Sequence, residues 1–106
     1  MKAMLSQPMN GKTEEEIVAT RGKAIQALET QGYELVDTYF NDEWSIKETM
    51  ESKGVVQIPV RFLAKSLEKM SLCNAVYFCK GWEQARGCRI EHEVAVAYGL
   101  NVIYEE

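Results

Sequence analysis

The chain has 106 residues and an ordinary share of hydrophobic and charged side chains, which is typical of one globular domain, residues 1–106, with its own core. Its net charge of −4 and lack of a basic run favour a small polar metabolite over a nucleic acid polymer, because binding a phosphate backbone requires clustered Lys and Arg. No apolar run approaches the roughly 18 residues of a membrane span and no signal peptide is visible, so we expect a cytoplasmic protein with no membrane partner.

The cysteines and the single histidine do not form a recognisable metal or disulfide pattern. Cys73, Cys79 and Cys88 are odd in number and lack CxxC spacing, so we interpret them as small apolar core residues in a reducing compartment. His92 is the only histidine, which leaves the chain without the residues for a histidine-based zinc site. We therefore expect no metal site.

The first third of the chain predicts a strand, a loop, a helix and a second strand. Residues 2–6 form the first strand, and residues 7–11 form a turn-rich loop after it. Thr13 has the spacing of an N-cap in a capping box, and the helix that it begins extends to about Gln31. A strand over residues 33–36 completes a βαβ unit, which implies a right-handed crossover and a parallel sheet.

The middle of the chain has a weaker pattern. Over residues 40–57 the periodicity fades, and a short helix at residues 46–52 is expected within it. This segment is either a surface connection or a lid over the site, since long loops are often functional. Pro59 suits the beginning of a further helix, which leads into the next strand.

The last third contains the best strand of the chain and the stretch that we single out for function. The strand covers residues 75–79, and a polar loop from Gly81 opens into a helix that Gly99 ends. A last strand follows at residues 101–104. Strands that alternate with helices in this way predict an α/β fold of the doubly wound kind.

One carboxylate interrupts the apolar face of the last helix. Successive side chains are about 100° apart on a helix, which places Glu91 at the centre of the stripe that should pack against the sheet, whereas Glu93 points the other way. Burying a carboxylate without partners costs several kcal/mol, so Glu91 is the leading candidate for a functional residue. The residues that share its direction are Gly87, Cys88, Val94, Ala95 and Tyr98.

The carboxyl ends of the strands mark the expected position of a ligand. In open parallel sheets, ligands bind beyond these ends, at the crevice where the strand order reverses. Three loops should meet there: residues 6–11, residues 37–40 and residues 81–87. The first loop carries small and amide-bearing residues, which allow close approach of a sugar or phosphate: Ser6, Gln7, Asn10 and Gly11.

Glu91 brings chemistry to this crevice. It lies in the second turn of a helix that begins at the same edge, where the helix dipole helps to keep a carboxylate ionised. Beside a sugar, such a carboxylate can attack the anomeric carbon or stabilise an oxocarbenium-like transition state. The alternative is structural, with Glu91 as the buried partner of Arg86 or Arg61.

Four segments resemble the signature of a small uncharacterised bacterial and phage family, and the resemblance covers nearly the whole chain. That family is similar to the nucleoside 2-deoxyribosyltransferases and the deoxynucleoside 5'-monophosphate N-glycosidases. The similarity to these enzymes rests on the first loop and on the spacing of Gly87, Glu91 and Ala95. The four segments are Leu5-Ser6-Gln7-Pro8-Met9-Asn10-Gly11, Ala64-Lys65-Ser66-Leu67-Glu68-Lys69-Met70, Gly81-Trp82-Glu83 and Arg86-Gly87-Cys88-Arg89-Ile90-Glu91-His92-Glu93.

The resemblance implies a flavodoxin-like three-layer sandwich with four or five parallel strands, a homodimer or higher homo-oligomer, no cofactor, and Glu91 as the nucleophile. Those enzymes carry an aspartate two residues before the glycine, where this chain has Ala85. Protonation of the leaving group would therefore fall to Asp37, to Glu83 or to a neighbouring subunit. Trp82 either stacks on the base or anchors its loop by packing. The substrate-binding residues implied are Ser6, Gln7, Pro8, Met9, Asn10, Gly11, Gly81, Trp82, Glu83 and Gly87.

Two functions follow as expectations. The first is an enzyme that transfers or hydrolyses the N-glycosidic bond of a nucleoside or nucleotide through Glu91, with Asp37 as the preferred acid. The second is a catalytically inactive nucleotide-binding or sensor module of the same fold, which the absent aspartate would permit. A third hypothesis is a structural subunit of an oligomer, in which Glu91 only pairs with a buried arginine.

Overall fold

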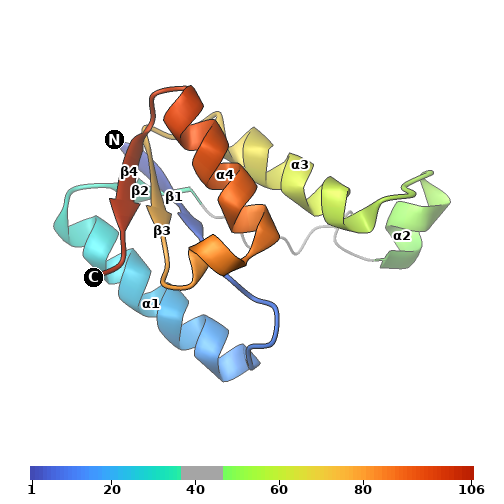
Figure 1. The fold of residues 1–106 in the computed structure, drawn as a ribbon, viewed down its shortest axis with the longest axis horizontal. Coiled ribbons are helices and arrows are strands. Elements are labelled where there is room, and N and C mark those ends of the chain that lie inside the picture. Colours follow the sequence, from blue (N-terminus) through green and yellow to red (C-terminus); the bar gives the residue numbers. More distant parts are fainter. Residues whose placement is uncertain (37–46) are drawn as a thin grey trace.

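The computed structural model describes residues 1–36 and 47–106 and contains one four-stranded sheet (Figure 1). All strand pairs are parallel, and the strand order is β2-β1-β3-β4. This is an α/β architecture consistent with the flavodoxin-like sandwich that we predicted. The strands are β1 (Lys2–Ser6), β2 (Glu34–Leu35), β3 (Ala75–Phe78) and β4 (Asn101–Tyr104).

The strand order places a reversal between the two central strands. From β1 the chain moves outward to β2, and then crosses back to β3 on the other side of β1. Ser6 pairs with Phe78 at the carboxyl ends of β1 and β3. The loops that leave these two strands therefore diverge to opposite faces of the sheet and open a crevice between them, where ligands bind in folds of this kind.

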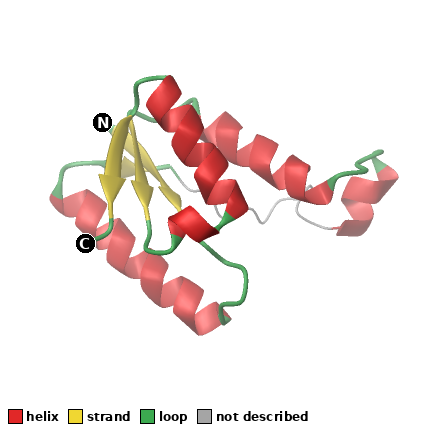
Figure 2. Cartoon of the chain, viewed as in Figure 1, coloured by secondary structure: helices red, strands yellow, loops and turns green. Residues whose placement is uncertain are grey.

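Helices cover both faces of the sheet (Figure 2). Helix α1 packs against β1 and β2 on one face, whereas α3 and α4 pack against each other and the sheet on the other (Figure 1). Helix α2 lies beyond the beginning of α3, away from the sheet (Figure 1). None of the helices in residues 1–36 and 47–106 has the length and apolarity to cross a membrane. The helices are α1 (Glu14–Thr30), α2 (Lys47–Ser52), α3 (Ile58–Met70), α4 (Arg86–Ala97) and the 3-10 turn η2 (Trp82–Gln84).

The period-2 geometry of the central strands divides the core into two layers. Because successive strand side chains point to opposite faces, Leu5 packs on the α1 side and Met4 on the α3 and α4 side. All four residues of β3 are buried, as expected for a central parallel strand with helices on both faces. The α1 layer includes Ala3, Leu5, Ala24, Leu28, Ala75, Tyr77 and Cys79, and the other layer includes Met4, Met70, Val76, Phe78 and Ala95.

Most predicted element boundaries are confirmed, with small differences. The capping box of α1 is present: the Thr13 hydroxyl accepts a hydrogen bond from the Glu16 backbone N–H at 3.1 Å. The second strand is shorter than residues 33–36, because this edge strand pairs only with the first two residues of β1. The third strand ends at Phe78, although the Cys79 N–H still donates to the Ser6 carbonyl.

The structure differs from the sequence-based prediction at the end of the last helix. Tyr98 was expected on the buried face of the last helix, but it is 80% exposed because α4 ends at Ala97 and Tyr98 has already left helical geometry. Asp37 lies outside the described residues, and so does the first part, residues 40–46, of the middle segment for which a lid or a surface connection was expected. The short helix expected within that segment is present as α2.

Candidate active site

Glu91 is buried, as its position on the helix predicted. Its side chain is 8% exposed and lies between the buried residues Cys88 and Ala95, one turn before and after it. Glu93 is exposed on the opposite face of α4. Helical spacing alone therefore identified which of the two glutamates faces the sheet.

The carboxylate of Glu91 meets the end of β1. The Ser6 hydroxyl donates a hydrogen bond to Glu91 Oε1 at 3.2 Å, and Ser6 is only 1% exposed. Within residues 1–36 and 47–106, no Lys or Arg forms an ion pair with Glu91, so the expected alternative of Arg86 or Arg61 as its partner is not found. Burial without a cation is therefore the main influence on its ionisation.

Burial raises the pKa of Glu91 from 4.5 to about 7, and the hydrogen bond from Ser6 opposes this shift. The cause is desolvation, since the charged form loses more solvation than the neutral form when it leaves water. Near neutral pH, both the ionised and the protonated form of Glu91 are thus accessible. A carboxyl group in this state can serve as a nucleophile when ionised and as an acid when protonated.

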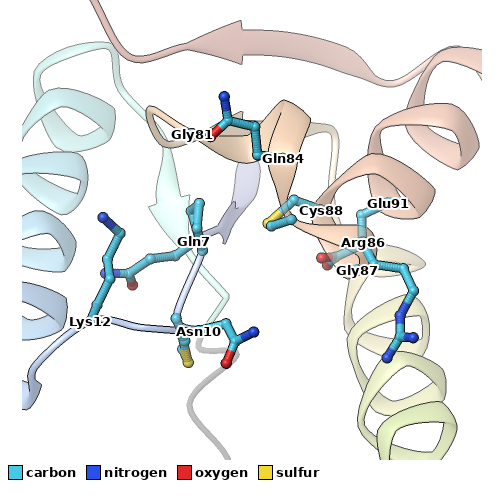
Figure 3. Close-up of a pocket in the computed structure, with 12 residues that line it drawn as sticks. Gln7, Asn10, Lys12, Gly81, Gln84, Arg86, Gly87, Cys88 and Glu91 are labelled. Carbon is cyan, nitrogen blue, oxygen red and sulfur yellow. The ribbon is translucent and has the colours of Figure 1, made fainter.

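A cavity of about 780 Å³ lies beside Glu91, where the loops after β1 and β3 meet the beginning of α4. We call it the rim cavity. Figure 3 shows the loop residues Gln7, Asn10 and Lys12 facing the first turns of α4 across it. Its volume is within the range of small-molecule sites. The residues that line it are Gln7, Pro8, Met9, Asn10, Lys12, Gly81, Gln84, Ala85, Arg86, Gly87, Cys88 and Glu91.

Close approach of the two loops shapes this cavity. Gly81 has a φ of +89°, which a residue with a side chain rarely adopts, and a Cβ at this position would lie 3.7 Å from the Pro8 ring. The Gln7 amide donates to the Ile17 carbonyl at 2.7 Å and ties the first loop to α1. The walls are therefore held by backbone geometry and by a hydrogen bond to a neighbouring helix.

The charges around the rim cavity suit a polar or anionic ligand. Lys12 and Arg86 contribute cations, and Glu91 is the one carboxylate among the described lining residues. The cavity also borders the N-terminus of α4, where backbone N–H groups and the helix dipole favour negative charge. Of these residues, the sequence had suggested Glu91 as functional and Arg86 only as its structural partner.

The model of one protein family, described as a domain of unknown function (DUF4406), matches residues 1–104. The chain belongs to the DUF4406 family. The match extends from β1 to the last residue of β4 and includes both loops of the rim cavity. No curated protein and no solved structure matches the chain significantly. The chemistry of this DUF4406 domain therefore has to be inferred from its own residues.

The rim cavity of the DUF4406 domain brings together six of the predicted substrate-binding residues. Ser6 lies beneath the cavity as the partner of Glu91 and does not line it. Gly11 and Glu83 are exposed and are not among its lining residues. Five lining residues had not been predicted to bind substrate, although all follow or adjoin predicted segments: Lys12, Gln84, Ala85, Arg86 and Cys88. The six predicted residues at the cavity are Gln7, Pro8, Met9, Asn10, Gly81 and Gly87.

Trp82 packs in an aromatic cluster that consists of Phe78, Trp82, His92 and Tyr104. Its ring stacks on His92 with a centroid distance of 4.1 Å and an interplanar angle of 22°, and on Tyr104 at 5.8 Å. Trp82 is not among the residues that line the rim cavity. This arrangement corresponds to the loop anchor that we considered, because the ring fixes η2 against α4 and β4.

Cys88 lines the rim cavity of the DUF4406 domain but does not provide a thiolate. The pKa of its thiol is raised to about 11, mainly by burial; a hydrogen bond from Ser6 lowers it and the nearby Glu91 adds a smaller increase. The thiol is thus protonated at neutral pH and is a poor nucleophile. In the part of the chain that the structure describes, no three His, Cys, Asp or Glu residues gather in a way that could hold a metal ion.

Proposed function

We propose that this DUF4406 domain cleaves or transfers the N-glycosidic bond of a nucleoside or nucleotide, with Glu91 as the nucleophile. The observation that carries the proposal is the Glu91 carboxylate, which is buried at the wall of the rim cavity with no cation beside it among the described residues. The cavity lies at the carboxyl ends of β1 and β3, where the strand order reverses. A desolvated carboxylate in this position costs stability, so a chemical role provides a reason for it.

In the proposed reaction, the ionised carboxylate attacks C1′ of the sugar. A bond forms between C1′ and a Glu91 oxygen as the bond from C1′ to the base nitrogen breaks, and its electron pair leaves with the base. The base then takes up a proton. Water, or a ring nitrogen of a second base in a transfer reaction, then attacks C1′ and loses its proton to solvent, while the bond between C1′ and the Glu91 oxygen breaks and its electron pair returns to the carboxylate. The pKa of about 7 implies that the rate should rise as the pH passes through 7 and then level off.

The proton for the departing base has three candidate sources in this proposal. Asp37 lies outside the described residues, and Glu83 is exposed and does not line the rim cavity. A residue from a second copy of the chain is the third source, in keeping with the homo-oligomer that the family resemblance implies. Lys12 and Arg86 would bind the anionic or polar part of the substrate, while Asn10 would contact the sugar.

The test is release of free base from a panel of deoxynucleosides and deoxynucleoside monophosphates, followed by chromatography. The wild-type protein should release base, and Glu91→Ala should lower the rate at least ~1000-fold because the nucleophile is lost. Glu93→Ala is the matched control, since it removes an exposed glutamate from the same helix. Equal release by the wild type and Glu91→Ala would contradict the mechanism.

A second candidate function is a nucleotide-binding or sensor module without catalysis. The observation that favours it is the lack of a second carboxylate among the described residues of the rim cavity, which leaves no visible acid for the leaving group. In this case intact nucleotides should raise the unfolding temperature of the protein, because a ligand that binds only the folded state stabilises it. The same samples should then contain no free base after several hours, whereas appearance of base would exclude this function.

A further inference from the structure

Ser6 has a position that its sequence context did not predict. It is the last residue of β1, and its carbonyl accepts a hydrogen bond from the Cys79 N–H at 2.9 Å. This bond and the pairing with Phe78 fix the Ser6 backbone against β3. The side chain is 1% exposed and does not line the rim cavity. Ser6 is thus poorly placed to touch a ligand and well placed to hold a neighbouring group.

The group that it contacts is the carboxylate of Glu91. The Ser6 hydroxyl donates a hydrogen bond to Oε1. This bond occupies one of the two carboxylate oxygens from the side of the sheet. The hydroxyl also lies near enough to Cys88 to oppose the rise in the pKa of that thiol. Since the thiol keeps its proton at neutral pH, Glu91 is the group that offers a negative charge to the Ser6 hydroxyl.

We propose that Ser6 is a positioning residue, which holds Oε1 of Glu91 so that the second carboxylate oxygen is presented to the rim cavity. Its catalytic consequence rests on the proposed function, but the contact itself does not. By donating to the ionised form, Ser6 also favours the state of Glu91 that attacks a sugar carbon. Ser6 therefore contributes to orientation and to proton affinity without contacting substrate.

In the part of the chain that the structure describes, Ser6 is the main favourable contact of the Glu91 carboxylate. On α4, Cys88 is neutral and Arg86 makes no ion pair with the carboxylate. Lys12, from the loop after β1, lines the same cavity without reaching ion-pair distance, and Cys79 at the end of β3 has a thiol pKa of about 12. The residues of α3 that line the groove on the other side of Glu91 are uncharged: Pro59, Val60, Phe62, Leu63 and Ser66.

The first test needs no substrate. In the ligand-free protein, the side-chain carboxyl of Glu91 can be followed by carbon NMR as the pH is changed. The wild-type midpoint should lie at about 7, and Ser6→Ala should raise it to about 8, because one hydrogen bond to the charged form is lost. Ser6→Cys keeps a weaker donor of similar size and should give an intermediate midpoint. Ser52→Ala, which removes an exposed serine on α2, should leave the midpoint unchanged.

The second test follows base release against pH. Ser6→Ala should lower kcat about 10- to 100-fold with little change in KM and should move the rising limb of the profile upward, with Ser6→Cys between it and the wild type. A raised KM with an unchanged kcat and an unchanged midpoint would overturn the proposal, because it would make Ser6 a substrate ligand. If the wild type releases no base, the proposed function fails, whereas the NMR midpoints still support or reject the contact. If the Glu91 titration has the same midpoint in the wild type, Ser6→Cys and Ser6→Ala, the proposed contact between Ser6 and Glu91 is rejected.

Discussion

Two neighbouring residues of α4 have opposite effects on the stability of the fold. Glu91 is buried against β1, and in residues 1–36 and 47–106 it accepts a hydrogen bond from Ser6 and has no cation beside it. His92, the next residue, stacks on Trp82 and hydrogen-bonds Tyr104 with 2.6 Å between Nε2 and the hydroxyl oxygen. One side of the helix thus carries a carboxylate that opposes folding when ionised, while the other carries aromatic contacts that favour it.

The difference separates residues that hold the fold from residues that are available for chemistry. The aromatic cluster joins β3, η2, α4 and β4 at the same end of the sheet as the rim cavity. It therefore fixes the beginning of α4, and with it the position of Glu91. We infer that stacking on one side offsets part of the cost of the buried carboxylate on the other.

The largest effect on stability is expected from Trp82→Ala. This change removes a mostly buried ring that contacts three other aromatic residues, and it should lower the free energy of unfolding by about 3 kcal/mol at every pH. Urea unfolding at pH 5 and pH 8 measures it. Tyr98→Ala is the control, because Tyr98 is 80% exposed and should change stability by less than about 0.5 kcal/mol. Similar losses in both variants would show that the aromatic cluster does not stabilise the fold.

The second-largest change in the free energy of unfolding is expected from Glu91→Gln, and it should depend on pH. The folded-state pKa of about 7 is above the ordinary value of 4.5, so the folded wild type binds more protons than the unfolded chain between these values. Its free energy of unfolding therefore falls as the pH rises through this window, and the glutamine variant avoids that loss. From pH 5 to pH 8, the variant should gain roughly 2 to 3 kcal/mol relative to the wild type.

Urea unfolding at pH 5, 6.5 and 8 measures this pH dependence. Glu93→Gln is the matched control, because Glu93 is exposed on the same helix and its loss should leave the pH dependence of the wild type intact. A difference in the free energy of unfolding that moves in favour of the wild type from pH 5 to pH 8 would contradict the prediction. That result would indicate that Glu91 is part of a stabilising ion pair, as in the structural hypothesis.

The smallest effect is expected from Tyr104→Phe. This change keeps the stacked ring but removes the hydroxyl that hydrogen-bonds His92, so unfolding should become easier by about 1 kcal/mol. Thermal unfolding at fixed pH measures the loss, with Tyr98→Phe as the control. A loss as large as that of Trp82→Ala would show that the hydrogen bond, rather than stacking, provides most of the stability that the aromatic cluster contributes.

Local patterns predicted most of the fold. The capping box at Thr13, the apolar strand after residue 74 and the alternation of strands with helices depend on neighbours in sequence, and the structure confirms them. The burial of Glu91 was predicted for the same reason, because helical spacing fixes which side chains share a face. Tyr98 marks where this reasoning failed, since the periodicity did not show that the helix stops at Ala97.

The surroundings of Glu91 depended on tertiary structure. Ser6 lies 85 residues away in sequence, and only the pairing of β1 with β3 places its hydroxyl beneath the carboxylate. The same is true of Trp82, for which base stacking and a packed loop anchor were both open until the ends of β3 and β4 placed Phe78 and Tyr104 beside it. By itself, the sequence determined which glutamate faces inward, because that is a property of one helix. Its hydrogen-bond partner, the absence of a cation beside it in the described residues and its pKa of about 7 were decided by the packing of the sheet.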